Sequence, residues 1–325
     1  MAMRCVLRKA GLIQVLASVL AAQGLCVAQD PSKAAADENS TISVDVRRVV
    51  LYVTVREGKT GFVGDLTKEN FIVKEDGKVQ QIHQFSRDDV PVAVGLVIDN
   101  SRSMINKRDE VVAAGKAFVA ASNASDETFV VHFNNQITFG LPQDRMFSSD
   151  RAELDSALDK MRLFGETALY DAIQVALDHL EKAKLTKRAL FVISDGGDNR
   201  SASKMKDVVK AAELSGALFY AIGIYDPMDG DANPDALKRL AHGTGGEAFF
   251  PKSLAEVSGL CESIAHDLRN QYTLVYAPPE RVNDSSFHKI EVSVKDPKGR
   301  KLTVRSRTGY YGPAAKAARA KEGQK

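Results

Sequence analysis

The sequence predicts an α/β fold, in which a doubly wound, mostly parallel sheet is joined to an accessory antiparallel β domain formed by the N- and C-terminal flanks. Two observations predict the parallel sheet. Continuous apolar runs, such as residues 92–98 and 189–193, suit strands that are buried on both faces. Segments with apolar residues at helical spacing alternate with these runs. A third observation predicts the accessory domain, because both flanks of residues 91–270 consist of extended runs and turns.

The N-terminal β segment covers residues 41–90. Ile42, Val44 and Val46 alternate with polar residues, as in a strand with one buried face. Glycine-containing stretches then separate the extended runs, as is typical of turns between antiparallel strands. These turns are expected at residues 57–61 and 75–78.

Residues 91–270 are expected to form the α/β domain. Val111, Ala114 and Phe118 are spaced as on one face of a helix. An Asn134-Asn135 turn is expected to join a strand pair at residues 128–133 and 136–141. Further strands are expected at 189–193, 218–224 and 246–250, and further helices at 150–162, 168–184, 203–215, 234–241 and 253–270.

The C-terminal β segment covers residues 271–312, with extended runs at 272–276, 288–294 and 302–305. We expect it to pair with the N-terminal β segment, so that the α/β domain is inserted into one accessory β domain. Residues 313–325 are rich in Ala and Lys and are expected to be a disordered tail.

The first 28 residues have the pattern of a signal peptide. A basic region from Arg4 to Lys9 precedes an apolar run, and Cys26 and Ala28 supply small residues at the −3 and −1 positions of a cleavage site. We therefore expect an exported protein, either periplasmic or secreted, with a flexible linker at residues 29–40.

A membrane-spanning helix is the alternative for this apolar run. Gln14 and Gln23 make the run short and only mildly apolar, so this alternative is weaker. No later stretch is long and apolar enough to cross a bilayer, and no integral membrane segment is expected after cleavage.

Charge and cysteine content exclude some classes of protein. The formal charge of +2 falls to −1 when the three basic residues of the predicted leader are removed, which gives no basis for nucleic-acid binding. Cys261 is the single cysteine outside the leader region, so no internal disulfide is possible in the mature chain. It lies among apolar residues at helical spacing and is expected to be a buried, unreactive thiol.

Five oxygen-bearing residues stand where strands end or helices begin. Asp99, Ser101 and Ser103 follow the apolar run at residues 92–98, and Asp195 follows the run at 189–193. Ligands bind at the carboxyl ends of strands in open α/β sheets, and adjacent parallel strands would bring Asp99 and Asp195 together. Thr167 would reach in from a loop. The first three residues alone could equally be helix N-caps.

The chemistry of this set suits a hard divalent cation. Two carboxylates and three hydroxyls are oxygen ligands of the kind that Mg²⁺ prefers, with Mn²⁺ or Ca²⁺ as alternatives. Two carboxylates neutralise the ion, whereas the hydroxyls add no charge. The ion would therefore still attract one more anionic oxygen, such as an Asp or Glu carboxylate of another protein.

Residues 90–270 resemble the von Willebrand factor type A family, which has a Rossmann-like fold and a metal-ion-dependent adhesion site (MIDAS). That site has an Asp-x-Ser-x-Ser motif, a distant Thr and a later Asp-Gly, and all of them occur here in the same order. The resemblance therefore implies that the metal ligands are Asp99, Ser101, Ser103, Thr167 and Asp195.

The flanks, including Arg307-Thr-Gly-Tyr-Tyr311, are similar to an acidobacterial family of exported proteins related to von Willebrand factor type A. Glu166 departs from the pattern, because relatives usually carry a small residue there. Its carboxylate would either tighten metal binding or repel an acidic ligand. Asp171, five residues further on, is expected to face solvent on a helix.

These features favour a metal-dependent binding protein, which acts as an adhesion or scaffold module and is not an enzyme. Its expected partner is a protein that offers an Asp or Glu carboxylate. Nucleic acid is not an expected partner. A metal-assisted hydrolase that uses the same ion is the alternative, although the sequence shows no evident general base for it. A metal-free scaffold is a third possibility.

Overall fold

The computed structural model describes residues 48–315, apart from 59–60, 161–164, 225–231 and 280–283. The predicted signal peptide (residues 1–28) and linker (29–40) lie outside the described residues, as does most of the predicted tail. The alternation predicted at Ile42, Val44 and Val46 also lies outside them. Among the helices of the described part, none is long and apolar enough to cross a membrane.

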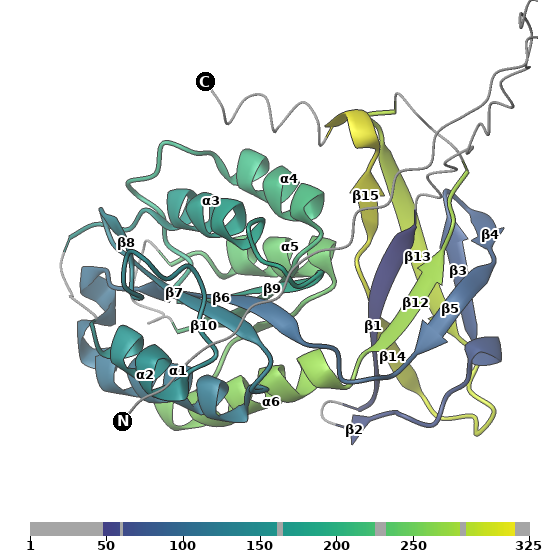
Figure 1. The fold of residues 1–325 in the computed structure, drawn as a ribbon, viewed down its shortest axis with the longest axis horizontal. Coiled ribbons are helices and arrows are strands. Elements are labelled where there is room, and N and C mark those ends of the chain that lie inside the picture. The colour runs from purple at the N-terminus through teal and green to yellow at the C-terminus, as the bar shows by residue number, and fades with distance from the viewer. Residues whose placement is uncertain (1–47, 59–60, 161–164, 225–231, 280–283, 316–325) are drawn as a thin grey trace, which may run out of the picture. The chain divides into compact units, whose positions relative to one another are not determined.

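A six-stranded sheet forms the centre of the α/β domain (Figure 1), in the order β11-β10-β9-β6-β7-β8. All its pairs are parallel except β7 with β8, which are antiparallel as predicted from the Asn134-Asn135 turn. The strands are β6 (Val92–Asp99), β7 (Glu127–Phe133), β8 (Ile137–Phe139), β9 (Lys187–Ser194), β10 (Leu218–Gly223) and β11 (Ala248–Phe249).

Helices cover both faces of this sheet, which confirms the doubly wound arrangement. Figure 1 shows α1, α2 and α6 on one face and α3, α4 and α5 on the other. Their bounds are α1 (Arg108–Ala121), α2 (Arg151–Asp159), α3 (Leu169–Leu180), α4 (Met205–Ser215), α5 (Pro234–Thr244) and α6 (Val257–Arg269). Short 3₁₀ helices precede α1 and α6, at η2 (Arg102–Lys107) and η3 (Leu254–Glu256).

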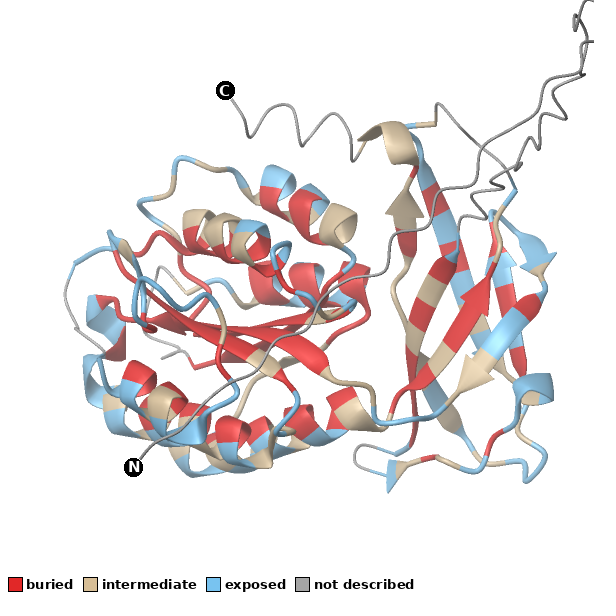
Figure 2. Cartoon of the chain, in the orientation of Figure 1, coloured by how far each residue is buried: buried red, intermediate tan, exposed pale blue. Residues whose placement is uncertain are grey.

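Every residue of β6 is buried in the core of the α/β domain (Figure 2). Gly95 shows how closely the neighbouring strands pack. A Cβ atom at this position would lie 2.5 Å from the Phe129 ring on β7 and 2.8 Å from Leu190 on β9. Cys261 on α6 is fully buried, and burial raises the pKa of its thiol well above the ordinary range, as expected for an unreactive cysteine.

The two flanks build a separate β unit of two antiparallel sheets. One has the order β14-β1-β12-β5, with β2 paired to β1, and the other has the order β15-β13-β3-β4. Their strands are β1 (Val49–Glu57), β2 (Gly61–Phe62), β3 (Phe71–Glu75), β4 (Lys78–Gln80), β5 (Ile82–Ser86), β12 (Tyr272–Tyr276), β13 (Phe287–Val294), β14 (Leu302–Arg305) and β15 (Gly309–Tyr311). A 3₁₀ helix, η1 (Lys68–Asn70), precedes β3.

N-terminal and C-terminal strands are neighbours within each of these sheets. Val53 on β1 pairs with Tyr272 on β12, and Val73 on β3 pairs with Val292 on β13. Their apolar side chains share one core. The prediction that both flanks form one accessory antiparallel β domain is therefore confirmed, although β15 was not predicted.

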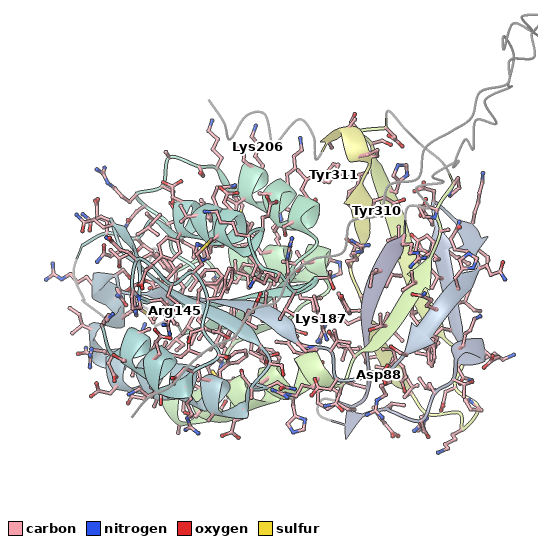
Figure 3. The ribbon with its side chains drawn as sticks, in the orientation of Figure 1. Asp88, Arg145, Lys187, Lys206, Tyr310 and Tyr311 are labelled. Atoms are coloured by element: carbon pink, nitrogen blue, oxygen red, sulfur yellow. The ribbon has the colours of Figure 1, made fainter. Side chains whose placement is uncertain are left out.

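A buried polar network joins the β unit to the α/β domain. Asp267 on α6 is fully buried and accepts hydrogen bonds from Thr54 on β1 (3.0 Å) and from Tyr220 on β10 (2.7 Å). Arg305 on β14 forms an ion pair with the same carboxylate. Lys187, at the start of β9 (Figure 3), donates to the Leu268 carbonyl, and burial lowers its pKa to about 8. These contacts fix the end of α6 against the accessory sheet.

Candidate metal centre

Asp99 is the last residue of β6, and its side chain is completely buried. The backbone amide of Ser101 donates to its Oδ1 at 2.8 Å, and the Ser194 hydroxyl donates to its Oδ2 at 2.6 Å. Because both carboxylate oxygens accept hydrogen bonds, the orientation of Asp99 is fixed at the carboxyl end of the strand.

Asp195 reaches the same place from the neighbouring strand. β6 and β9 are parallel with Ile98 opposite Ile193, so the residues that follow these strands emerge side by side. Ser103 Oγ lies 2.5 Å from Asp195 Oδ2 and 3.1 Å from Ser101 Oγ. The structure therefore brings together four of the five residues predicted from the sequence: Asp99, Ser101, Ser103 and Asp195.

Thr167, the fifth residue, is 7% exposed and lies just before α3. Its backbone amide donates to Asn199 Oδ1 (2.9 Å), and its carbonyl accepts from the amides of Asn199 and Arg200 (both 3.1 Å). The Arg102 amide also donates to the Gly165 carbonyl at 3.3 Å. These bonds hold the Thr167 loop against the turns that carry the other four residues.

The helix-capping alternative for Asp99, Ser101 and Ser103 is not supported. Ser101 occupies the N-cap position of η2, but its side chain makes no capping hydrogen bond. The hydroxyls of both serines are instead directed to each other and to Asp195. Their side chains therefore belong to the polar cluster at the edge of the sheet.

The electrostatics of the cluster fit a divalent cation. Burial, and then the nearby Asp195 carboxylate, raise the pKa of Asp99 to about 7. Within the described part of the chain, no lysine or arginine forms an ion pair with either carboxylate. Two buried carboxylates with the hydroxyls of Ser101 and Ser103 beside them suit a Mg²⁺-type ion, because its charge would remove their mutual repulsion.

Several supporting residues were missed by the sequence prediction. Ser194 binds Asp99 and also accepts a hydrogen bond from the Gly196 amide at 3.0 Å. Asp198 accepts from the Tyr170 amide at 2.8 Å and so ties the β9–α4 loop to α3. The sequence feature that could have indicated these residues is the polar run that starts at Ser194 and directly follows an apolar strand.

Asp171 was predicted to face solvent, and its side chain is only partly exposed. Its two carboxylate oxygens accept from the backbone amides of Ala202 and Ser203, both at 2.9 Å. Helical spacing alone could not show this, because the loop that binds Asp171 is about thirty residues away. Glu166 directly precedes Thr167 in the sequence, and its carboxylate is 3.6 Å from Arg200 Nε, with both side chains exposed.

The chain is similar to several known proteins. The model of the von Willebrand factor type A domain family matches residues 94–262. A von Willebrand factor type A protein from Catenulispora acidiphila superposes with a TM-score of 0.52 at 12% identity, over 82% of this chain and 75% of that one. The vWF domain of the type V pili tip protein Mfa5 from Porphyromonas gingivalis gives a TM-score of 0.47 at 15% identity, over 55% of this chain and 95% of that one.

An uncharacterized protein from Borreliella burgdorferi is 22% identical over 193 residues, which are 58% of this chain and 54% of that protein. The chain thus spans about half the length of this relative. The family match is the more informative result, because it extends over more than half of the chain and includes all five predicted metal ligands. This chain belongs to the von Willebrand factor type A domain family.

Proposed function

We propose that this protein is a metal-dependent binding module, which recognises an acidic residue of a partner protein through a MIDAS-type divalent cation. The proposal depends on one observation above all. Asp99 and Asp195 converge from adjacent strands with the hydroxyls of Ser101 and Ser103 between them. Mg²⁺ is the expected ion, with Mn²⁺ or Ca²⁺ as alternatives.

The metal-site residues would include both charged and neutral ligands. Asp99 and Asp195 would supply two negative charges, whereas Ser101, Ser103 and Thr167 would hold their oxygens in place without adding charge. When bound, the ion would supply positive charge for one further anionic oxygen. Because the two carboxylates are held by hydrogen bonds from Ser101, Ser194 and Gly197, little reorganisation would accompany binding.

A metal-assisted hydrolase is the second function that such residues could serve. It would need a general base within hydrogen-bond reach of an ion-bound water. Glu166 is the exposed carboxylate beside the cluster, but it faces Arg200. No specific observation favours hydrolysis, and binding accounts for the whole set of residues.

Export to the periplasm or the cell exterior is part of the proposal. It is supported by the pattern of residues 1–28. Mass spectrometry of material from the native host would test it, because a mature protein should begin near Gln29. A protein that retains Met1 in the cytoplasm would contradict it.

Partner capture with and without chelator tests the binding function. Tagged wild-type protein should retain its partner in Mg²⁺ or Mn²⁺ and release it in EDTA. Thr167→Ala should lose capture, whereas Thr303→Ala, on β14 of the accessory domain, should keep it. Equal capture in excess EDTA would mean that recognition lies elsewhere. The sheet edges of the accessory domain would then be the alternative binding surface.

A further inference from the structure

A second group of metal-ligating side chains lies in the accessory β domain, outside the α/β domain. Glu75 is the last residue of β3, Asp76 follows it, and His288 lies on β13, the strand that pairs with β3. One potential ligand atom from each residue lies within 4.8 Å of one from each of the others. These three residues, the His288 cluster, combine one imidazole with two carboxylates.

The turn between β3 and β4 fixes the position of Asp76. Asp76 and Gly77 have positive φ angles of 49° and 80°, as in the two-residue hairpin turn that an Asp-Gly pair favours. The Asp76 amide donates to the Lys289 carbonyl, and the Lys289 amide donates to Asp76 Oδ1, both at 2.9 Å. Asp76 is therefore bound to β13 through its backbone and one carboxylate oxygen, and its Oδ2 is directed to His288.

The imidazole ring of His288 lies between two carboxylates. Nδ1 lies 2.8 Å from Asp76 Oδ2, and Nε2 lies 2.6 Å from Asp284 Oδ2. A histidine that binds a metal through one nitrogen usually donates the hydrogen on the other to a carboxylate or a carbonyl, which fixes the ring. Asp284 would be this acceptor, so an ion would bind Nδ1, on the side of Asp76.

Glu75 is also held by neighbouring side chains. It is 1% exposed, and its Oε2 accepts hydrogen bonds from the hydroxyls of Tyr276 at 2.7 Å and Tyr310 at 3.2 Å. Carboxylates that bind metals are commonly oriented by such hydrogen bonds. The Glu75 side chain is therefore already positioned for coordination.

The charge and exposure of the cluster suit a divalent cation. Glu75, Asp76 and Asp284 supply three carboxylates, and Arg307 interacts electrostatically with Glu75. With a neutral His288 ring, these four ionised groups carry a net charge of −2, which one divalent ion would neutralise. The Asp76 side chain is 39% exposed and that of His288 is 8% exposed. An ion would therefore enter from solvent beside Asp76 and become largely enclosed.

We propose that Glu75, Asp76 and His288 form a second metal site, which binds a divalent transition ion of the Zn²⁺ type. Histidine nitrogen and carboxylate oxygens are common Zn²⁺ ligands, and three protein ligands leave the fourth position to water. The imidazole distinguishes this site from the all-oxygen set at Asp99, because Mg²⁺ prefers oxygen ligands. A bound ion would tie the β3–β4 turn to β13 and stabilise the accessory domain. This inference does not depend on the function proposed above.

Calorimetric titration with Zn²⁺ tests this site in the Asp99→Ala variant, in which the site at Asp99 is impaired. The chain is purified without a polyhistidine tag, because such a tag would itself bind Zn²⁺. We expect one Zn²⁺ ion per chain. Adding Asp284→Asn, which weakens the support of the imidazole ring, should lower the affinity by about 10–100-fold. Adding His242→Gln should leave the affinity unchanged, because this histidine is exposed on α5.

Asp76→Asn tests the ligand set with little change to the backbone. Asn tolerates a positive φ angle and keeps an acceptor oxygen for the Lys289 amide, but it lacks the negative charge. In the Asp99→Ala background, Zn²⁺ should raise the Tm, and this increase should be lost when Asp76→Asn is added. An Asp99→Ala chain that binds no Zn²⁺ would overturn the proposal, as would equal Zn²⁺ affinity with and without Asp76→Asn.

Discussion

Ser103 Oγ lies 2.5 Å from Asp195 Oδ2, so a hydroxyl from the turn after β6 meets a carboxylate from the end of β9. The two residues are 92 positions apart in the sequence. Their contact depends on the parallel pairing of β6 with β9, which places both strand ends at one edge of the sheet. The fold thus assembles the polar cluster, in which the pKa of Asp99 is raised by burial and by the nearby Asp195 carboxylate.

The metal-free protein should become less stable as the pH rises. The pKa of Asp99 is about 4 in an unfolded chain and about 7 in the folded protein. The stability that accompanies its protonation is therefore fully present below about pH 4 and is lost as the pH rises through 7. Thermal melts in EDTA should show a Tm that falls between pH 5 and pH 8.

Mg²⁺ should reverse this trend, because it favours the ionised carboxylates. The Tm increase caused by Mg²⁺ should be larger at pH 8 than at pH 5. Asp99→Asn is the matched control, since it keeps the shape of the side chain but cannot ionise. If this variant showed the same pH dependence and the same response to Mg²⁺, Asp99 would not be responsible for either.

Ser194→Ala should weaken metal binding although Ser194 is not a predicted ligand. The change removes the 2.6 Å hydrogen bond that orients Asp99. Loss of such a supporting contact lowers metal affinity by about tenfold or more. Calorimetric titration with Mn²⁺ would measure it. Ser194→Thr, which retains a hydroxyl, should recover part of the affinity, and a Thr variant as weak as Ala would argue against this role.

Gly95→Ala should destabilise the α/β domain by about 1–3 kcal/mol, because the added methyl group overpacks a filled core. The new Cβ atom would lie 2.5 Å from the Phe129 ring. Urea unfolding gives the change in the free energy of unfolding. Gly259→Ala is the control: this glycine lies in α6 with no neighbouring atom within 4 Å of an added Cβ. That substitution should be neutral or stabilising.

Asp267→Asn should destabilise the junction between the two domains by about 1–3 kcal/mol, the usual contribution of a hydrogen bond to a charged group, because Glu247 still pairs with both arginines. Arg305 and Arg56 both form ion pairs with this carboxylate. Asp235→Asn removes an exposed carboxylate that pairs with Lys238, and should change stability by less than about 1 kcal/mol. Similar unfolding midpoints for the two variants would show that the junction contributes little.

The sequence was sufficient to predict the fold class because its periodic patterns are local. The apolar runs of β6 and β9 and the helical spacing in α1 can be read within about ten residues each. The same runs placed Asp99 and Asp195 at strand ends, and the assumption that the two strands are adjacent then predicted their proximity. The structure confirms this adjacency.

The remaining features depend on contacts between distant segments. Asp171 binds a loop thirty-one residues away, and Asp267 binds Thr54 across 213 residues. No local pattern marks such partners. β15 was missed because three residues, Gly309–Tyr311, are too few to show a period of two, and the strand forms only by pairing with β13.

Calorimetric titration of the purified, metal-free protein with Mg²⁺ at pH 8 tests the central claim most directly. The account predicts saturable binding of one ion per chain, at least tenfold weaker binding in Asp99→Ala, and unchanged helical signal in circular dichroism. Asp109→Asn, which alters an exposed carboxylate on α1, should bind Mg²⁺ like the wild type. Wild-type affinity in Asp99→Ala would remove this residue from the site, and the absence of Mg²⁺ and Mn²⁺ binding in the wild type would contradict the account.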